Sequence, residues 1–212
     1  MPEGPEVAIT ADELQWSVGS TITNMVATSA HTATWTRTDA FITAVGCTIV
    51  GITTRGKKLI FVLRNTNNYT YMMVSSLGMT GRWTWIQSTD MEHCMFAITV
   101  TKGNNTANLY YTDSRRIGSL EWCFTHDDYQ ELLQRVGPAH LKYPITGESE
   151  YTPADWLQVV RAHPKMAVGK FINKQEYFSG VGNYLRSEIL YYTGVSPHRL
   201  LSTMTDTEVE WM

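Results

Sequence analysis

The sequence opens with Met1–Val7 (MPEGPEV), which places two prolines and two glutamates ahead of the first valine. Pro5 and Glu6 predict the start of a helix, because proline suits the first helical position and a carboxylate is favourable at the positive end of the helix dipole. Apolar residues at helical spacing then predict one buried face, made by Val7, Ala11, Leu14 and Val18. Pro2 and Glu3 precede that face and contribute nothing to it, so they need a reason other than the helix.

The composition predicts an ordinary globular protein. With 212 residues and 43% hydrophobic content, the chain can form one large domain or two small ones. There is no apolar run long enough to span a bilayer and no basic-then-apolar leader, so we expect an intracellular protein, in the cytoplasm, nucleoid or nucleus, with no membrane partner. The three cysteines and six histidines are scattered without metal-ligand spacing, which argues against a disulfide framework or a zinc site among these residues.

The charge distribution is more informative than the net charge. A net charge of −3 does not indicate a nucleic-acid-binding protein, since such proteins are usually basic. However, Arg37 is the only basic residue before residue 55, and the other 16 follow, some in clusters such as Arg55–Lys58 and Arg115–Arg116. Taken alone, a cluster of this kind is usually a solvated surface.

The chain changes character near residue 126, which predicts an α+β protein. Five short stretches rich in β-branched and aromatic residues predict strands, at residues 48–53, 59–63, 69–74, 95–100 and 107–111. This pattern indicates a β-sandwich or flattened barrel with flanking helices. From residue 127 the period becomes helical, with helices expected at about 127–136, from 153, and at about 183–192, and a linker at about 138–152. We therefore expect an N-terminal domain at 1–126 and a helical domain at 127–212.

Three separated stretches resemble the same family. They are residues 1–7, residues 54–59 (TRGKKL) and residues 179–190 (SGVGNYLRSEIL), with weaker matches in the expected order at 77–81 (LGMTG) and 112–118 (TDSRRIG). Together they resemble the formamidopyrimidine-DNA glycosylase / endonuclease VIII (Fpg/Nei) family. The resemblance implies a β-sandwich followed by a helix–two-turn–helix DNA-binding domain, and a base-excision-repair enzyme that acts on damaged double-stranded DNA as a monomer.

The resemblance also implies catalytic roles for three residues. Removal of Met1 would leave the Pro2 nitrogen as a free secondary amine, and the positive end of the helix beginning at Pro5 would favour its neutral, nucleophilic form. That amine would attack the sugar and form a Schiff base, and elimination would then cleave the strand. Glu3 would move protons as general acid and base. Lys57 would approach the phosphate at the lesion, although Arg-Gly-Lys-Lys before a strand also fits a solvated turn.

A second group of residues is implied in DNA binding. An enzyme that extrudes a base must fill the vacated space, and Met79, Arg115 and Ile117 match the residues that do so in the family. Ile117 stands where phenylalanine is usual, so its stacking would be weaker. His93 matches a position that contacts DNA, although a satisfied surface histidine fits it equally well. Asn183 would donate to the backbone of the lesion strand, or would simply cap its helix.

Two departures from the family pattern limit the interpretation. Lys174-Gln175 stands where Asp-Gln is usual. The chain stops at residue 212, before the β-hairpin finger of the relatives, so we expect a truncated chain without that finger's zinc cysteines and arginine, and no cofactor. The stretch at 182–190 looks closer to the endonuclease VIII branch, which favours oxidised pyrimidines. Two other classes stay open: a damaged-DNA-binding module without efficient catalysis, and a small tautomerase with an N-terminal proline base.

Overall fold

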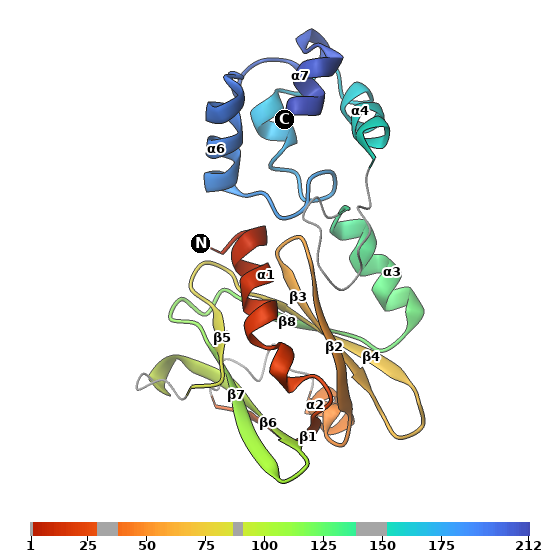
Figure 1. Cartoon of the computed structure of the whole chain (residues 1–212), viewed down its shortest axis with the longest axis vertical. Helices are drawn as coiled ribbons and strands as arrows, with labels where there is room; N and C mark the ends of the chain where they lie inside the picture. The colour runs from red at the N-terminus through yellow and green to blue at the C-terminus, as the bar shows by residue number, and fades with distance from the viewer. Residues whose placement is uncertain (1, 29–37, 87–90, 139–151) are drawn as a thin grey trace. The chain divides into compact units, whose positions relative to one another are not determined.

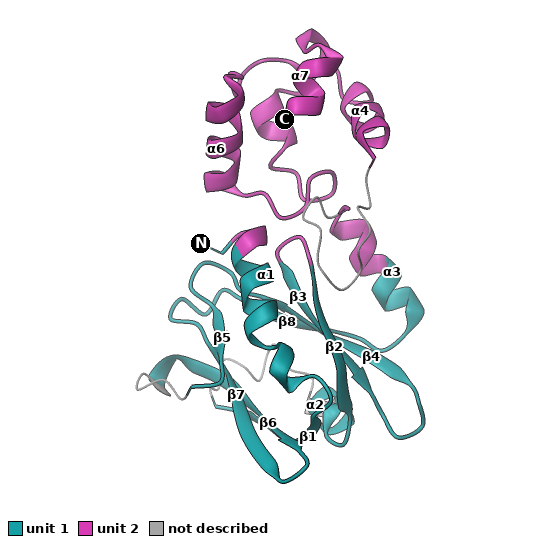
Figure 2. Ribbon diagram, in the orientation of Figure 1, with its two compact units in different colours: residues 1–2, 6–54, 58–130 teal, residues 3–5, 55–57, 131–212 magenta. Residues whose placement is uncertain are grey.

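The structure is a computed structural model that describes residues 2–28, 38–86, 91–138 and 152–212 (Figure 1). Its chain forms two compact units (Figure 2). The first contains residues 1–2, 6–54 and 58–130, and the second contains residues 3–5, 55–57 and 131–212. The units therefore divide within a helix at residue 130, and two short segments from the first half of the sequence belong to the second unit. A division at residue 126 stays a prediction.

The first unit is built on an antiparallel sheet of eight strands in the order β5-β7-β6-β1-β2-β3-β4-β8. The strands are β1 (Thr21–Ala27), β2 (Thr48–Arg55), β3 (Lys58–Arg64), β4 (Thr70–Ser76), β5 (Arg82–Thr84), β6 (Cys94–Lys102), β7 (Asn105–Thr112) and β8 (Ser119–Cys123). The five strands predicted from β-rich stretches are confirmed as β2, β3, β4, β6 and β7. Together with the helices described below, they confirm the α+β class.

The sheet folds over so that strands far apart in its order face each other. Phe61 on β3 packs against Trp83 on β5, with ring centroids 4.9 Å apart. The Trp83 indole N–H donates to Ser75 Oγ on β4 at 3.1 Å, and the Tyr111 hydroxyl on β7 donates to the Ser76 carbonyl at 3.2 Å. Because β5 and β7 are not neighbours of β3 and β4 in the sheet order, these contacts lie across a sandwich-like core.

Two helices of the first unit differ in how well the sequence predicts them. The N-terminal helix is confirmed as α1 (Gly4–Glu13), but it ends before Val18, and a 3-10 turn, η1 (Gln15–Ser17), follows. Residues 38–44 lie within the part of the chain predicted to be β structure, and that prediction is wrong because they form α2 (Thr38–Ala44). Ala40, Phe41 and Ala44 are buried, and this i, i+1, i+4 spacing fits one face of a helix rather than the alternation of a strand.

The second unit is helical in the part of the chain that the structure describes. It contains the end of α3 (His126–Arg135), then α4 (Pro153–Arg161), α5 (Val168–Phe171), α6 (Asn183–Thr193), a 3-10 turn, η4 (Leu201–Thr203), and α7 (Asp206–Trp211). The helices expected at 127–136, from 153 and at 183–192 are confirmed as α3, α4 and α6. Most of the predicted linker lies outside the described residues.

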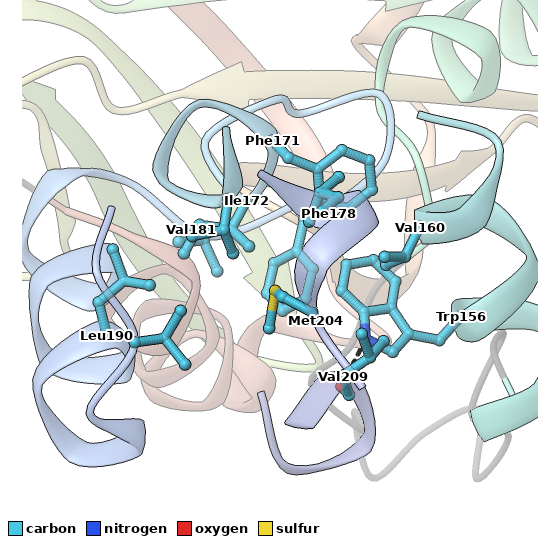
Figure 3. Close-up of a cluster of buried hydrophobic side chains, with 12 residues drawn as sticks. Trp156, Val160, Phe171, Ile172, Phe178, Val181, Leu190, Met204 and Val209 are labelled. Atoms are coloured by element: carbon cyan, nitrogen blue, oxygen red, sulfur yellow. Dashed lines mark hydrogen bonds between the residues drawn. The ribbon is translucent and has the colours of Figure 1, made fainter. Parts of the chain in front are cut away.

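An aromatic core holds the second unit together (Figure 3). The Trp156 ring on α4 meets Phe178 edge-on with centroids 4.8 Å apart, and its indole N–H donates to the Val209 carbonyl on α7 at 3.2 Å. The N-terminus of α7 carries a capping box, in which Thr205 and Glu208 bond each other's backbone N–H groups. These contacts tie the last helix of the chain to α4, and α6 packs beside the same core through Leu190.

Candidate catalytic and nucleic-acid-binding site

The Glu3 carboxylate lies at the N-terminus of α6, 179 residues further along the chain. It is fully buried. Its Oε2 accepts hydrogen bonds from the backbone N–H groups of Gly182 at 2.5 Å and Leu185 at 3.2 Å, and its Oε1 accepts one from Tyr184 at 3.1 Å. A helix leaves its first N–H groups without internal partners and carries partial positive charge there. The Glu3 carboxylate therefore supplies hydrogen-bond acceptors to the backbone N–H groups at the start of α6.

Lys57 lies beside this carboxylate, at the turn between β2 and β3. A Cβ atom placed on Gly182 would be 2.3 Å from Glu3 Oε1 and 2.5 Å from Lys57 Nζ, so both side chains converge on the same glycine. Burial lowers the pKa of Lys57, while the nearby Glu3 carboxylate opposes that shift by favouring the ammonium form. An amine with a lowered pKa next to a buried carboxylate is the kind of pair that proton-transfer sites use.

The predicted motifs at 1–7, 54–59 and 179–190 meet in the second unit. The Gly4 N–H donates to the Gly180 carbonyl at 2.8 Å. Gly56 has a φ of +56°, and a Cβ there would lie 2.7 Å from the Ser179 Cβ. The glycine at position 56 is therefore required both by its backbone conformation and by the closeness of the loop at Ser179.

Sequence reasoning missed the role of Gln175, which braces the loop that receives Glu3. Its side-chain amide donates to the Val181 carbonyl at 2.6 Å and accepts from the Gly180 N–H at 3.2 Å. The neighbouring Lys174, which departs from the family pattern, forms an ion pair with Glu176 at 2.7 Å. The sequence showed Gln175 at the glutamine position of the family's Asp-Gln pattern, but it gave no sign of which backbone groups this glutamine would bond.

Asn183 follows Gly182 in the sequence and Pro2 precedes Glu3, and the two residues differ in their exposure. Asn183 is the exposed first residue of α6, and its Oδ1 accepts a long hydrogen bond of 3.5 Å from the Asn173 side chain. The alternative that Asn183 caps its helix is wrong, because the cap residue is Gly182 and the capping carboxylate comes from Glu3. Pro2 is half-buried and one peptide bond before Glu3. Met1 lies outside the described residues.

The first unit brings the predicted void-filling residues together. Met79 and Ile117 are large apolar side chains that are 42% and 53% exposed. The Arg115 guanidinium donates to the Met79 sulfur at 2.9 Å, so the loop between β4 and β5 meets the loop between β7 and β8. His93 lines a cavity of about 220 Å³ together with Thr80, Arg82, Thr112 and Ser114.

A buried acid that the sequence did not single out lies beneath these two loops. Burial alone would raise the pKa of Asp113, but hydrogen bonds from Thr80 and from the backbone of Gly118, Arg115 and Ile117 hold that pKa below its ordinary value. The match at 112–118 contained Asp113, but the resemblance assigned roles only to residues that follow it.

The second unit also presents a groove of about 890 Å³ between α5 and α6. Its charged lining residues are Lys170, Lys174 and Arg186, and Tyr191 and His198 also line it. A concave surface whose charged lining residues are all basic suits an anionic partner such as a phosphate backbone.

The described residues contain no group of three or more His, Cys, Asp or Glu side chains that could hold a metal ion. The three cysteines are buried and free, as their spacing predicted. No helix in the described ranges is both long and apolar enough to cross a membrane.

The folded sandwich, the buried Glu3 carboxylate and the glycine-rich start of α6 are features of a DNA glycosylase fold. Residues 1–120 match the family described as "Formamidopyrimidine-DNA glycosylase N-terminal domain". Because the match covers more than half of the chain, the protein belongs to the formamidopyrimidine-DNA glycosylase family.

Individual relatives agree with this membership. The chain is 27% identical to a formamidopyrimidine-DNA glycosylase of Yersinia enterocolitica over 99% of its own length and 72% of the relative's. It is 26% identical to an endonuclease 8 of Pectobacterium carotovorum over 99% and 74% of the two lengths. It spans 56% of the length of a formamidopyrimidine-DNA glycosylase of Desulfitobacterium hafniense, at 28% identity over 78% of this chain.

A solved structure shares the fold. The complex of Lactococcus lactis Fpg with DNA containing an abasic site aligns with a TM-score of 0.80 and 22% identity, covering 99% of this chain and 73% of that one.

Proposed function

We propose that this protein is a DNA glycosylase of base excision repair with abasic-site lyase activity, which removes oxidised bases, pyrimidines in preference, from double-stranded DNA. The observation that carries the proposal is a pair of groups close to the N-terminus: the buried Glu3 carboxylate, which accepts from three backbone N–H groups at the start of α6, and the half-buried Lys57 amine beside it. Family membership and the DNA glycosylases among the relatives support the same class of activity.

In this mechanism the Pro2 nitrogen, freed by removal of Met1, attacks C1′ of the damaged nucleotide. The bond from C1′ to the base breaks, and the base leaves with the bonding electron pair and takes up a proton. The amine then loses its proton and the sugar ring opens: the C1′–O4′ bond breaks, O4′ takes up a proton from Glu3, and an iminium forms at C1′. The iminium acidifies the 2′ proton, and loss of that proton with departure of the 3′ phosphate cleaves the strand by elimination. Glu3 moves protons at the sugar, and Lys57 acts near the phosphate during elimination.

DNA contact in this proposal comes from both units. Met79, Arg115 and Ile117 fill the space that the extruded base leaves, and His93 lies near them. Asn183 donates to the lesion strand, next to the basic groove of α5 and α6.

Borohydride trapping tests the proposal. Wild type, Pro2→Gly and Glu3→Gln are incubated with duplexes that contain thymine glycol, 8-oxoguanine or a plain abasic site, and the adducts are reduced. We expect wild type to be trapped on all three and Pro2→Gly on none, whereas Glu3→Gln loses base excision but keeps some trapping on the abasic site. Equal trapping by all three proteins would show that a lysine forms the adduct. Mass spectrometry of the purified protein should show that Met1 is absent.

One observation favours a second candidate, a damaged-DNA-binding module without efficient catalysis. The basic groove of the second unit does not depend on Pro2 or Glu3 for its charge. A gel shift with the abasic duplex, combined with the absence of any reduced adduct, would favour this module over the enzyme.

A further inference from the structure

Asp113 is buried and accepts hydrogen bonds from both loops that carry the proposed void-filling residues. Its Oδ1 accepts from the Thr80 hydroxyl at 2.5 Å and from the Arg115 N–H at 3.1 Å. Its Oδ2 accepts from the Ile117 N–H at 2.9 Å and the Gly118 N–H at 2.8 Å. A single carboxylate therefore bonds the loop between β4 and β5 and the loop between β7 and β8.

The second of these loops has a backbone conformation that its sequence alone does not favour. Arg116 has a φ of +55°, in the left-handed region that residues with a Cβ rarely adopt. Its N–H donates to the Asp113 carbonyl at 3.2 Å, so Asp113 contributes its backbone as well as its side chain to this turn. Such a conformation persists where surrounding contacts over-determine it, and the bonds to Asp113 are those contacts. The unfavourable residue lies between Arg115 and Ile117, the two side chains that the loop presents.

The two loops also leave no room between them. A Cβ on Gly78 would lie 2.8 Å from the Gly118 nitrogen and 3.0 Å from Ile117 Cγ1. A Cβ on Gly81 or Gly118 would lie 2.3 Å or 1.9 Å from the Tyr111 hydroxyl oxygen. The loops are therefore packed against each other and against one buried tyrosine.

We propose that Asp113 is a positioning residue that joins the two loops into one preformed wedge, so that Met79, Arg115 and Ile117 enter the DNA together. This inference rests on the proposed function. Inserting side chains into a base stack costs less when they are already ordered, because the ordering entropy is not lost at the moment of binding. Ordering these side chains before binding matters more in this protein, because Ile117 offers no aromatic ring to stack on the neighbouring base.

The test uses the whole chain and two variants. Thr80→Val removes the hydroxyl that bonds Asp113 across the loops, keeps the shape of an exposed side chain, and leaves the backbone bonds to Asp113 in place. Asp113→Asn removes the charge. The matched control is Thr106→Val, which removes the threonine hydroxyl contact to Thr101 at 3.2 Å in the exposed hairpin of β6 and β7.

The probe is a duplex with an unreactive tetrahydrofuran analogue of the abasic site opposite 2-aminopurine, whose fluorescence rises when it is unstacked. We expect wild type and Thr106→Val to raise the fluorescence equally. Thr80→Val should weaken duplex binding by about tenfold, the size of one charge-assisted hydrogen bond, with a matching loss of signal. Asp113→Asn should weaken duplex binding by at least the same factor. Binding to the single strand of the same sequence, which has no stack to open, should change by less than about twofold.

The inference is wrong if Thr80→Val or Asp113→Asn weakens binding to the duplex and to the single strand by the same factor. It is also wrong if Thr80→Val binds the duplex as tightly as Thr106→Val, or if wild type binds the duplex without raising the fluorescence. Because the analogue cannot react, these outcomes are independent of the trapping assay. Failure of Pro2 to form an adduct would refute the proposed chemistry and leave the wedge standing.

Discussion

Replacing Glu3 by glutamine tests whether the N-terminal carboxylate organises α6 as well as moving protons. The amide keeps one oxygen, which can take the place of Oε2 and still accept from Gly182 and Leu185. Its NH₂ group then faces the Tyr184 N–H, so a donor meets a donor where Oε1 accepts now. The loss of one charge-assisted hydrogen bond and of an anion at a helix N-terminus should lower the free energy of unfolding by about 3 kcal/mol.

This loss should appear as a fall in Tm of about 8 °C for a chain of this size. Denaturant unfolding and thermal melting measure it, with Glu13→Gln as the matched control, since that change is at the exposed C-terminal end of α1 and should cost less than about 0.5 kcal/mol. A Glu3→Gln protein as stable as the control would contradict the reasoning, because the carboxylate would then contribute nothing to α6. Activity should be compared well below the lower Tm, so that loss of excision reports chemistry rather than unfolding.

Three further predictions concern the same unit. Gly182→Ala should cost about 2 kcal/mol of stability and remove most borohydride trapping, because the new Cβ would press on Glu3 Oε1 and Lys57 Nζ. Lys57→Met should be at least as stable as wild type near pH 8, because it removes a half-buried amine whose charged form is partly desolvated. Because the pKa of Lys57 is lowered in the folded protein, the unfolded chain binds more protons just below pH 10.5, and the free energy of unfolding of wild type should rise with pH. Denaturation at pH 8 and pH 10 should therefore show a smaller difference in free energy of unfolding between Lys57→Met and wild type at the higher pH. Arg199 lowers the pKa of Glu208 to about 2, so this ion pair stabilises the fold above pH 4.5 and is lost as pH falls towards 2; the Tm of Glu208→Gln should lie below wild type at pH 7 and converge with it near pH 2.

Local patterns in the sequence predicted most of the elements. The strands β2, β3, β4, β6 and β7 follow from short β-rich stretches between turns, and α3, α4 and α6 follow from their helical periodicity. The helix α2 was missed because its Thr and Ile residues favour strands by propensity, whereas its alanines at positions 40 and 44 are buried against the sheet. Tertiary burial decided its conformation.

The candidate site could be predicted only in its parts. Pro2, Glu3 and Lys57 were singled out by resemblance, but neither spacing nor propensity could show that Glu3 would cap a helix 179 residues away. Gln175 and Asp113 were missed for a different reason: their importance lies in which backbone N–H and carbonyl groups they bond, and although these partners lie within six residues in the sequence, irregular loops leave no periodic signal.

The glycines explain why motifs so far apart agree with one family. At Gly56 a side chain would strike Ser179, and at Gly182 it would strike Glu3 and Lys57. Each glycine is thus required by a residue of another motif, and Gly56 is also required by its own positive φ. A chain that kept one motif and altered another would place a Cβ against a buried carboxylate, a lysine amine or a loop backbone, with little room to relax. The three stretches therefore behave as one packing unit, in which the missing side chain at Gly182 leaves room for Glu3 and Lys57.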